Sequence, residues 1–296
     1  MPRHTHALKT GVPVLLFVTL VWGTTFPIIR AASSQLSGVE ISALRFLIAG
    51  LCMLPFAVKA NRTAWRDGLL LGAVALVSYV TQAIGLEYIS ANRSAFITSL
   101  NVLMVPLLGV LLGGRLSLQI MLAAILACAG IGLMSWESGG NWLGDGATFL
   151  CALSYAIYVI LLSRRIRLHA TRTLAATQIV AMAVLGLVWL AVAEVRGPAL
   201  ASLLPRAESA WVSLLYLGVV ASAGMLFLQA AGQRQVSAEK AAVIYAMEPV
   251  FAALFGWLWL GETLGLRGFA GGALVVAAVI LGEWRFRPVK RTLGAT

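Results

Sequence analysis

Charged residues are scarce in this chain, and acidic residues are the scarcest. Among 296 residues only 22 are Lys or Arg and 11 are Asp or Glu, so 11% of the chain is charged. Soluble proteins carry about 25% charged residues, because their surfaces face water. The low charge excludes a soluble enzyme, and the high apolar content excludes a disordered chain.

Several chemical motifs are also missing. The three cysteines lie far apart inside apolar runs without C-x-x-C spacing, which predicts neither a disulfide framework nor a zinc site: Cys52, Cys128 and Cys151. The sequence has no P-loop, no H-E-x-x-H, no G-x-S-x-G and no pair of carboxylates inside an apolar run. These absences predict that the chain is not an enzyme and carries no cofactor or metal.

What the chain has instead is apolar sequence, since 60% of its residues are hydrophobic and the mean hydropathy is +0.91. A membrane-spanning helix needs about 20 apolar residues. Charge, Pro and Gly divide the chain into ten such runs: 12–30, 39–58, 68–88, 91–113, 117–136, 144–163, 172–194, 210–231, 238–260 and 265–284. We therefore predict an all-α polytopic membrane protein with ten transmembrane helices and no separate extramembrane domain.

The basic residues predict its orientation. If the N-terminus is cytoplasmic, 16 of the 22 Lys and Arg residues fall in cytoplasmic segments, five fall outside, and Arg45 lies within the second span. Short cytoplasmic loops are enriched in Lys and Arg, so both termini are predicted inside. The net charge of +11 then reports topology and contact with membrane lipid, and no nucleic-acid partner is expected. The first run resembles a signal peptide, but its length and prolines predict a retained span.

An internal repeat divides the chain. A shift of 147 residues aligns Gln82 with Gln229, Ser90-Ala91 with Ser237-Ala238, Ala95 with Ala242, Asn101 with Glu248, Gly109 with Gly256 and Gly114 with Gly261. We predict two five-helix repeats, 1–140 and 141–296, within one membrane unit. Because five is odd, the halves must be inverted relative to each other. Inverted repeats are typical of transporters that work by alternating access, with the substrate site near the midplane.

Few polar or aromatic side chains fall near the predicted midplane. Those that we predict to line a substrate site are Trp22, Tyr79, Asn101, Tyr155, Tyr158, Tyr245 and Glu248. A charged side chain at the bilayer centre costs roughly 2.5–3.5 kcal/mol on insertion scales, which indicates a use for Glu248. The buried tyrosines each need a partner for the hydroxyl, and as a group they predict a cavity for flat or amphipathic solutes.

Alternatives remain for individual residues. Glu248 is either a counter-ion or proton site, or a protonated side chain that bonds a backbone carbonyl freed at Pro249. Asn101 either contacts the ligand or makes an interhelical hydrogen bond. Arg45 is expected to snorkel, or to pair with an acidic residue, Glu40 or Glu87. Prolines within spans can bend helices, and we predict gating hinges at Pro27, Pro106 and Pro249.

Two stretches resemble a known family. Ser37 to Leu51 is similar to the second-span signature of EamA-type proteins in the drug/metabolite transporter superfamily. Glu248-Pro249 through Gly256 and Gly261-Glu262 to Leu264 resembles the ending of that family, and Trp22-Gly23 its first-span element. The first half departs from the pattern, with Gly114-Arg115 where the second has Gly261-Glu262.

The resemblance implies a bacterial inner-membrane exporter of amino acids or related metabolites that works through a central cavity. The midplane aromatics are similar to those of YddG-like amino-acid exporters. Alternative readings are an exporter of drug-like cations, nucleosides or sugars, and a membrane scaffold or receptor that transports nothing. We expect a monomer, because ten helices offer enough partners for intramolecular packing. The sequence does not decide between proton antiport and facilitated diffusion.

Overall fold

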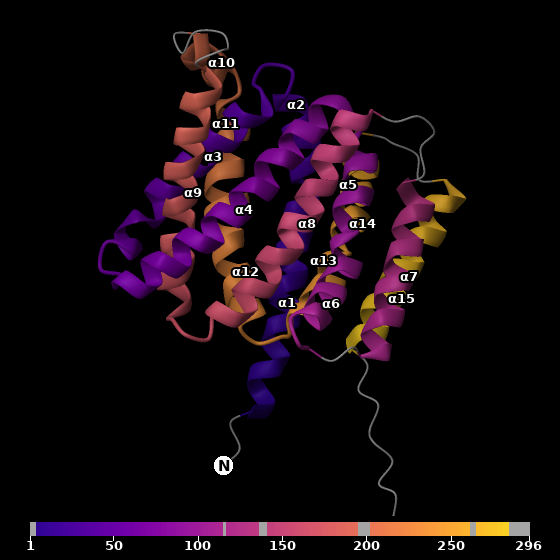
Figure 1. The fold of residues 1–296 in the computed structure, drawn as a ribbon. Coiled ribbons are helices and arrows are strands. Elements are labelled where there is room, and N and C mark those ends of the chain that lie inside the picture. The colour runs from indigo at the N-terminus through magenta and orange to yellow at the C-terminus, as the bar shows by residue number, and fades with distance from the viewer. Residues whose placement is uncertain (1–3, 115–116, 136–140, 195–201, 261–264, 284–296) are drawn as a thin grey trace, which may run out of the picture.

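A computed structural model describes residues 4–114, 117–135, 141–194, 202–260 and 265–283, and all secondary structure in these ranges is helical (Figure 1). In chain order the helices are α1 (His4–Gly23), α2 (Thr25–Ala32), α3 (Gly38–Ala57), α4 (Arg62–Tyr88), α5 (Ala91–Ser99), α6 (Asn101–Leu111), α7 (Leu118–Ser135), α8 (Trp142–Arg165), α9 (Thr171–Glu194), α10 (Leu203–Ser209), α11 (Trp211–Leu215), η2 (Tyr216–Gly224), α12 (Met225–Gln233), α13 (Ala238–Tyr245), α14 (Glu248–Leu260) and α15 (Leu266–Glu283). The prediction of an all-helical fold is confirmed for these residues.

Among the residues that the structure describes, seven stretches are long and apolar enough to cross a membrane: Thr10–Ala32, Gly38–Ala57, Arg62–Tyr88, Arg93–Leu111, Trp142–Arg165, Thr171–Ala193 and Trp211–Gln233. Two further helices are apolar but shorter, Leu118–Leu133 and Leu266–Gly282. The remaining predicted span, 238–260, is divided between α13 and α14. The count of ten spans and their orientation therefore stay predictions.

Several of the predicted spans are broken. The run 12–30 is interrupted at Thr24, between α1 and α2, and the run 91–113 at Leu100, between α5 and α6. The run 238–260 is interrupted at Ala246 and Met247. Such breaks free backbone groups in the middle of a span, which membrane proteins tolerate where protein or a cavity surrounds them.

The three predicted hinge prolines lie near these breaks. Pro27 is the third residue of α2 and Pro249 the second residue of α14. Proline fits the first turn of a helix, because the N–H groups there have no intrahelical partner. Pro106 instead lies inside α6, six residues after Leu100. The break before α6 thus does not depend on a proline at the start of the new helix.

The repeat shift relates two of the broken segments. Ser90 caps α5 and accepts a hydrogen bond from the Arg93 N–H at 3.1 Å, and Ser237 caps α13 and accepts one from the Lys240 N–H at 3.4 Å. Asn101 and Glu248, also 147 residues apart, are the first residues of α6 and α14. The path from α5 to α6 and the path from α13 to α14 run in opposite directions (Figure 1).

Small residues let the helices approach closely. A Cβ atom on Gly72 of α4 would lie 2.7 Å from the Gln178 carbonyl oxygen of α9, and one on Gly50 of α3 would lie 2.6 Å from the Ala183 Cβ atom. Membrane helices lack a hydrophobic drive to associate, so such close backbone packing supplies much of their attraction. It places α3 and α4 against α9.

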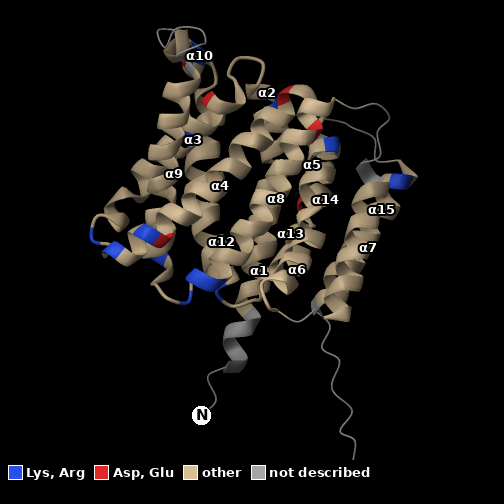
Figure 2. Cartoon of the chain, in the orientation of Figure 1, with Lys and Arg blue, Asp and Glu red and all other residues tan. Residues whose placement is uncertain are grey.

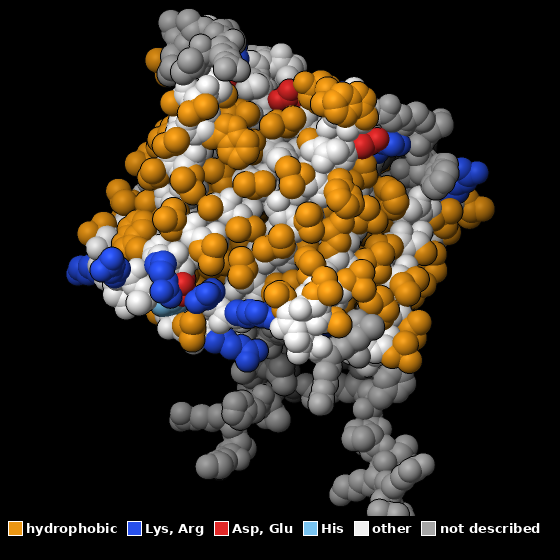
Figure 3. Space-filling view, in the orientation of Figure 1, with side chains coloured by type: hydrophobic (Ala, Val, Ile, Leu, Met, Phe, Trp, Pro, Cys, Tyr) orange, Lys and Arg blue, Asp and Glu red, His pale blue; other side chains and the backbone are white. Residues whose placement is uncertain are grey.

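The two ends of the helical bundle differ in charge. Figure 2 shows Lys and Arg gathered at the lower end, where α4 begins and where α8 is joined to α9. The start of α1 and the end of α15 lie at this same end (Figure 1). Figure 3 shows that the flank between the ends is largely hydrophobic. The hydrophobic flank suits a bundle surrounded by lipid.

At the basic end one buried carboxylate contacts several basic side chains. Asp67 of α4 has a side chain only 3% exposed, and its oxygens lie 2.9 Å from His169 Nε2, 3.4 Å from Arg165 Nη1 and 3.5 Å from Arg66 Nη2. His169 and Arg165 belong to the connection after α8 and to the last turn of α8. Asp67 therefore ties the start of α4 to the end of α8.

We expect Asp67→Ala to lower the free energy of unfolding by about 1–3 kcal/mol, since it leaves the nearly buried His169 and the partly exposed Arg165 without their acceptor. Thermal or chemical unfolding of the purified protein in detergent measures this change. Arg66→Gln is the control, because that side chain is 73% exposed and its loss should change stability by about 0.5 kcal/mol or less. Equal effects of the two variants would show that the network does not stabilise the fold.

Candidate substrate site

A small cavity lies among the helices. Its lining comes from α1, α2, α3, α4, α5, α8 and α14: Trp22, Thr25, Arg45, Ser78, Tyr79, Gln82, Thr98, Tyr155 and Glu248. The space that water can enter there is about 20 Å³. One buried water needs roughly 10–15 Å³ of such space. The cavity therefore has room for one or two waters and is closed to a larger solute.

Four of the seven residues that the sequence predicts for the site line this cavity: Trp22, Tyr79, Tyr155 and Glu248. Tyr158 and Tyr245 lie directly behind it, because each has its ring centroid 5.9 Å from that of Tyr155. The ring centroid of Trp22 is 6.3 Å from that of Tyr155 and 5.9 Å from that of Tyr245. Residues from α1, α8 and α13 thus form one aromatic cluster.

A chain of hydrogen bonds fixes the aromatic wall. Gln229 Nε2 donates to the Tyr155 hydroxyl at 2.9 Å, and the Tyr158 hydroxyl donates to Gln229 Oε1 at 3.2 Å. Gln178 Nε2 in turn donates to the Tyr158 hydroxyl at 2.8 Å. The two glutamines thereby hold the hydroxyl groups of Tyr155 and Tyr158 in place.

Tyr245 is held by a separate set of contacts. Its hydroxyl donates to Gln233 Oε1 at 3.1 Å, and Gln233 Nε2 donates to the Val159 carbonyl and to Ser163 Oγ at 2.7 Å. Tyr245 is 3% exposed, and its hydroxyl is occupied by this bond. It supports the wall with its ring, whereas its polar group bonds away from the cavity lining.

Asn101 does not line the cavity. Its Nδ2 donates to the Thr98 carbonyl at 2.7 Å, and its Oδ1 is buried with no hydrogen-bond partner. The contact is local, within the break between α5 and α6, and is not the interhelical bond that was one of the two alternatives. Asn101 thus donates a hydrogen bond to a backbone carbonyl at the break. Thr98, and not Asn101, lines the cavity.

Glu248 faces the cavity from the start of α14. Within the described part of the chain its carboxylate accepts no hydrogen bond and makes no ion pair. A carboxylate that lines a cavity without a partner is poised to bind a cation or a hydrogen-bond donor. In the structure Glu248 is the acidic residue among those that line the cavity.

The prediction for Arg45 is wrong. Arg45 is 3% exposed and lines the cavity, and its Nε donates to Ser222 Oγ at 3.0 Å. Its guanidinium lies 5.1 Å from the Tyr79 ring centroid and therefore makes a cation–π contact. Glu40, one of the expected acidic partners, pairs instead with Arg206, whose Nη2 lies 2.5 Å from Glu40 Oε1. Arg45 has no acidic partner within 4 Å among the described residues.

A wide helical turn holds two of these side chains. The π-helix η2 presents Ser222 to Arg45, and its Ala221 carbonyl accepts a hydrogen bond from Trp22 Nε1 at 3.0 Å. π-helical turns are rare and occur often at functional sites. Nothing in the sequence of this turn signals the irregular geometry. For Gln229, which supports the aromatic wall, the sequence signal is its alignment with Gln82, which lines the cavity.

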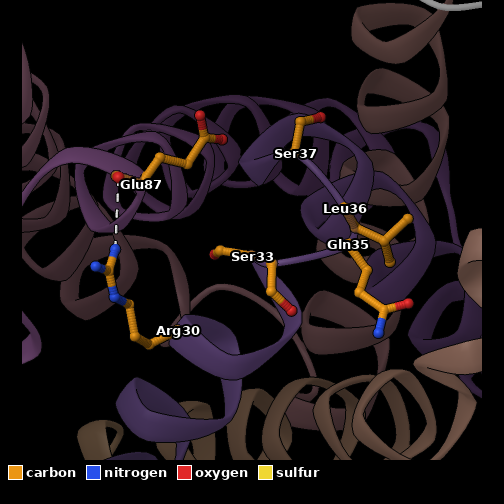
Figure 4. Close-up of a pocket in the computed structure, with 7 residues that line it drawn as sticks. Arg30, Ser33, Gln35, Leu36, Ser37 and Glu87 are labelled. Carbon is orange, nitrogen blue, oxygen red and sulfur yellow. Dashed lines mark hydrogen bonds between the residues drawn. The ribbon is translucent and has the colours of Figure 1, made fainter.

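A larger hollow of about 500 Å³ is lined by Arg30, Ser33, Ser34, Gln35, Leu36, Ser37 and Glu87 (Figure 4). Thr25 and Gln82 of the cavity lie five residues before Arg30 and Glu87 on the same two helices, α2 and α4. The Arg30 guanidinium donates to the carbonyls of Leu86 and Glu87 and so joins the two helices. The cavity and the hollow share no lining residue.

Comparison with known proteins places this arrangement in a family. The EamA-like transporter family matches residues 9–136 and 142–282. A transporter of Archaeoglobus fulgidus described as uncharacterized is 29% identical over 92% of this chain and 85% of its own length. The uncharacterized transporter YdfC of Bacillus subtilis is 24% identical over 88% of this chain and 86% of its own length.

A plant relative and a solved structure extend the comparison. A WAT1-related chloroplastic protein of Arabidopsis thaliana is 26% identical over 90% of this chain and 68% of its own length. A crystal structure at 17% identity superposes with a TM-score of 0.72 over 93% of this chain and 97% of that one, which shows the shared fold. The family matches cover both halves of the sequence and include the helices that build the cavity. The chain belongs to the EamA-like transporter family and is a multi-pass membrane transporter.

Proposed function

We propose that this transporter exports zwitterionic amino acids through the central cavity by alternating access. The observation that carries the proposal is the pair of opposite charges on one small cavity. Arg45 and Glu248 both line it, and neither has a partner of opposite charge among the described residues. An amino acid supplies a carboxylate for the first and an ammonium for the second. Burying two unpaired charges is costly, and a zwitterion would compensate both.

The remaining lining supports this class of substrate. Trp22, Tyr79 and Tyr155 offer apolar faces, which suit a neutral side chain, and an aromatic one best. The carboxylate of Glu248 beside aromatic rings would also suit an organic cation. Arg45 disfavours that alternative, because a cation in so small a cavity would lie close to the guanidinium. Sugars and nucleosides would leave both charges without counter-ions.

Alternating access is supported by the closed state of the cavity and the broken helices around it. About 20 Å³ is too small for an amino acid, so the surrounding helices must separate to admit one. The breaks at Thr24, at Leu100 and before Glu248 provide points where α1, α5 and α13 can move relative to the helices that follow. We propose that Pro27 and Pro249 limit this bending to the breaks before α2 and α14, and that Pro106 adds a separate bend inside α6.

The remaining features of the proposal follow from charge and packing. The basic end shown in Figure 2 is taken as cytoplasmic, which places both termini inside a bacterial inner membrane. Two inverted repeats, residues 1–140 and 141–296, would contribute the helices that exchange access. We take the monomer as the transporting unit, because one chain supplies the whole lining of the cavity.

Reconstitution into liposomes tests the proposal. Purified protein is inserted into vesicles, and flux is measured for labelled phenylalanine, leucine, an organic cation, a nucleoside and a sugar, against vesicles without protein. We expect saturable flux of the neutral amino acids and little flux of the other solutes. If no amino acid moves but another solute does, the substrate class is wrong; if nothing moves, the scaffold or receptor reading is favoured.

A further inference from the structure

A second concave site lies on the outer flank of the bundle, at the basic end. Two helices line it, α4 with Arg62, Trp65, Arg66 and Leu69, and α9 with Ala181, Val184 and Leu185. We call this hollow of about 430 Å³ the α4–α9 groove. It shares no residue with the central cavity, so the transport proposal does not account for it.

Charge is concentrated at one end of the groove. Arg62 is exposed and makes no hydrogen bond or ion pair among the described residues. Arg66 touches Asp67 through one nitrogen at 3.5 Å, but its side chain is 73% exposed and keeps other donors free. Two guanidinium groups one helical turn apart can hold a phosphate between them, because their planar donors match its oxygens.

The rest of the groove is apolar. Leu69 is 50% exposed and Val184 is 57% exposed, and both line the groove. Along α4 the lining residues follow the order Arg62, Trp65, Arg66, Leu69, so Trp65 lies between the two arginines. Tryptophan at the end of a span suits the boundary between headgroups and hydrocarbon. The order along the groove is therefore two charged side chains with an amphipathic ring between them, then hydrocarbon-like surface.

The surroundings of the groove agree with that order. Figure 3 shows basic side chains along the lower edge of the bundle and hydrophobic side chains directly above them. A soluble anion would contact only the two arginines, and the apolar wall of the groove would remain uncovered. A molecule with an anionic head and a hydrocarbon tail matches both parts.

We propose that the α4–α9 groove binds an anionic phospholipid, with its phosphate between Arg62 and Arg66 and an acyl chain along Leu69 and Val184. The site lies on the leaflet that faces the basic end of the bundle. Its occupant bridges α4 and α9, two helices that otherwise meet through small residues such as Gly72.

Native mass spectrometry of the purified full chain tests this binding. The protein is titrated in detergent with phosphatidylglycerol and, separately, with phosphatidylcholine of the same chain length. We expect tighter binding of phosphatidylglycerol. The double variant Arg62→Gln/Arg66→Gln should weaken phosphatidylglycerol binding by about 30-fold and remove the preference for it.

A matched control separates a site from general attraction to basic protein. Arg164→Gln/Arg167→Gln removes the same charge from exposed residues at the same end, outside the groove, and should change binding by less than about threefold. Val184→Trp fills the apolar part while leaving both arginines, and should weaken binding as well. The proposal is overturned if the two double variants weaken binding equally, or if phosphatidylcholine binds as tightly as phosphatidylglycerol.

Discussion

Arg45→Gln is expected to weaken the binding of phenylalanine by about 10- to 150-fold. A hydrogen bond to a charged group contributes roughly 1.5–3 kcal/mol, and each 1.4 kcal/mol is a factor of ten in affinity. Arg45 is the cation that lines the cavity, and glutamine keeps a polar side chain but is shorter and carries no charge. Calorimetric titration of the purified protein measures the change, and flux in liposomes should fall with it.

An analogue of the substrate supplies the control for Arg45. Phenethylamine has the same ring and ammonium group but no carboxylate, so its affinity should be unchanged or improved when the cationic side chain is removed. Arg45→Lys keeps the charge but loses the planar fork, and should fall between the wild type and the glutamine variant. If phenylalanine and phenethylamine lose affinity by the same factor, Arg45 acts on the structure through Ser222 and Tyr79 and not on the carboxylate.

Glu248→Gln is expected to reduce phenylalanine transport at least tenfold and to remove any stimulation by an imposed pH gradient. The variant deletes the negative charge that would face the ammonium group or carry a proton. Glutamine retains a donor for a backbone carbonyl near Pro249, so the alternative account, in which Glu248 only completes a helix break, predicts normal flux. Flux into liposomes with and without a pH gradient distinguishes the two.

Two comparisons sharpen this test. 3-Phenylpropionate lacks the ammonium group, so Glu248→Gln should leave its binding unchanged or improve it. Glu239→Gln neutralises another acidic residue of the same half, at the start of α13 and outside the cavity lining, and should leave transport close to wild type. Wild-type flux and pH response in Glu248→Gln would show that neither the counter-ion nor the proton role is correct.

The predicted site residues show how far sequence patterns extend. Glu248 and Asn101 stand out because a polar residue in an apolar run is unusual, and the repeat shift relates them. The structure shows that they are related in position, each beginning a helix after a break, but not in use. Glu248 reaches the cavity, whereas Asn101 bonds Thr98 beside it. A repeat aligns backbones, and the side chain at each position then meets different neighbours.

For Arg45 the sequence predicted the wrong contacts. Because Arg45 is the eighth residue of α3, it was expected to reach the membrane interface. Glu40 and Glu87 are the acidic residues close to Arg45 in the sequence or in the predicted topology. The contact that fixes the Arg45 guanidinium is instead with Ser222, 177 residues away. Likewise Gln178 and Gln229 were not predicted for the site, although they orient the tyrosines that were.

The sequence by itself determined that the protein lies in a membrane, that it is helical, and which few polar residues lie within apolar runs, because hydropathy and residue spacing are local properties of the chain. It also predicts two related halves. Only the tertiary structure decided which of those residues share a cavity. A membrane helix is apolar on nearly every face, so its periodicity carries little information about which face points inward. That choice depends on contacts between distant helices, such as those of Arg45 with Ser222 and of Trp22 with Ala221.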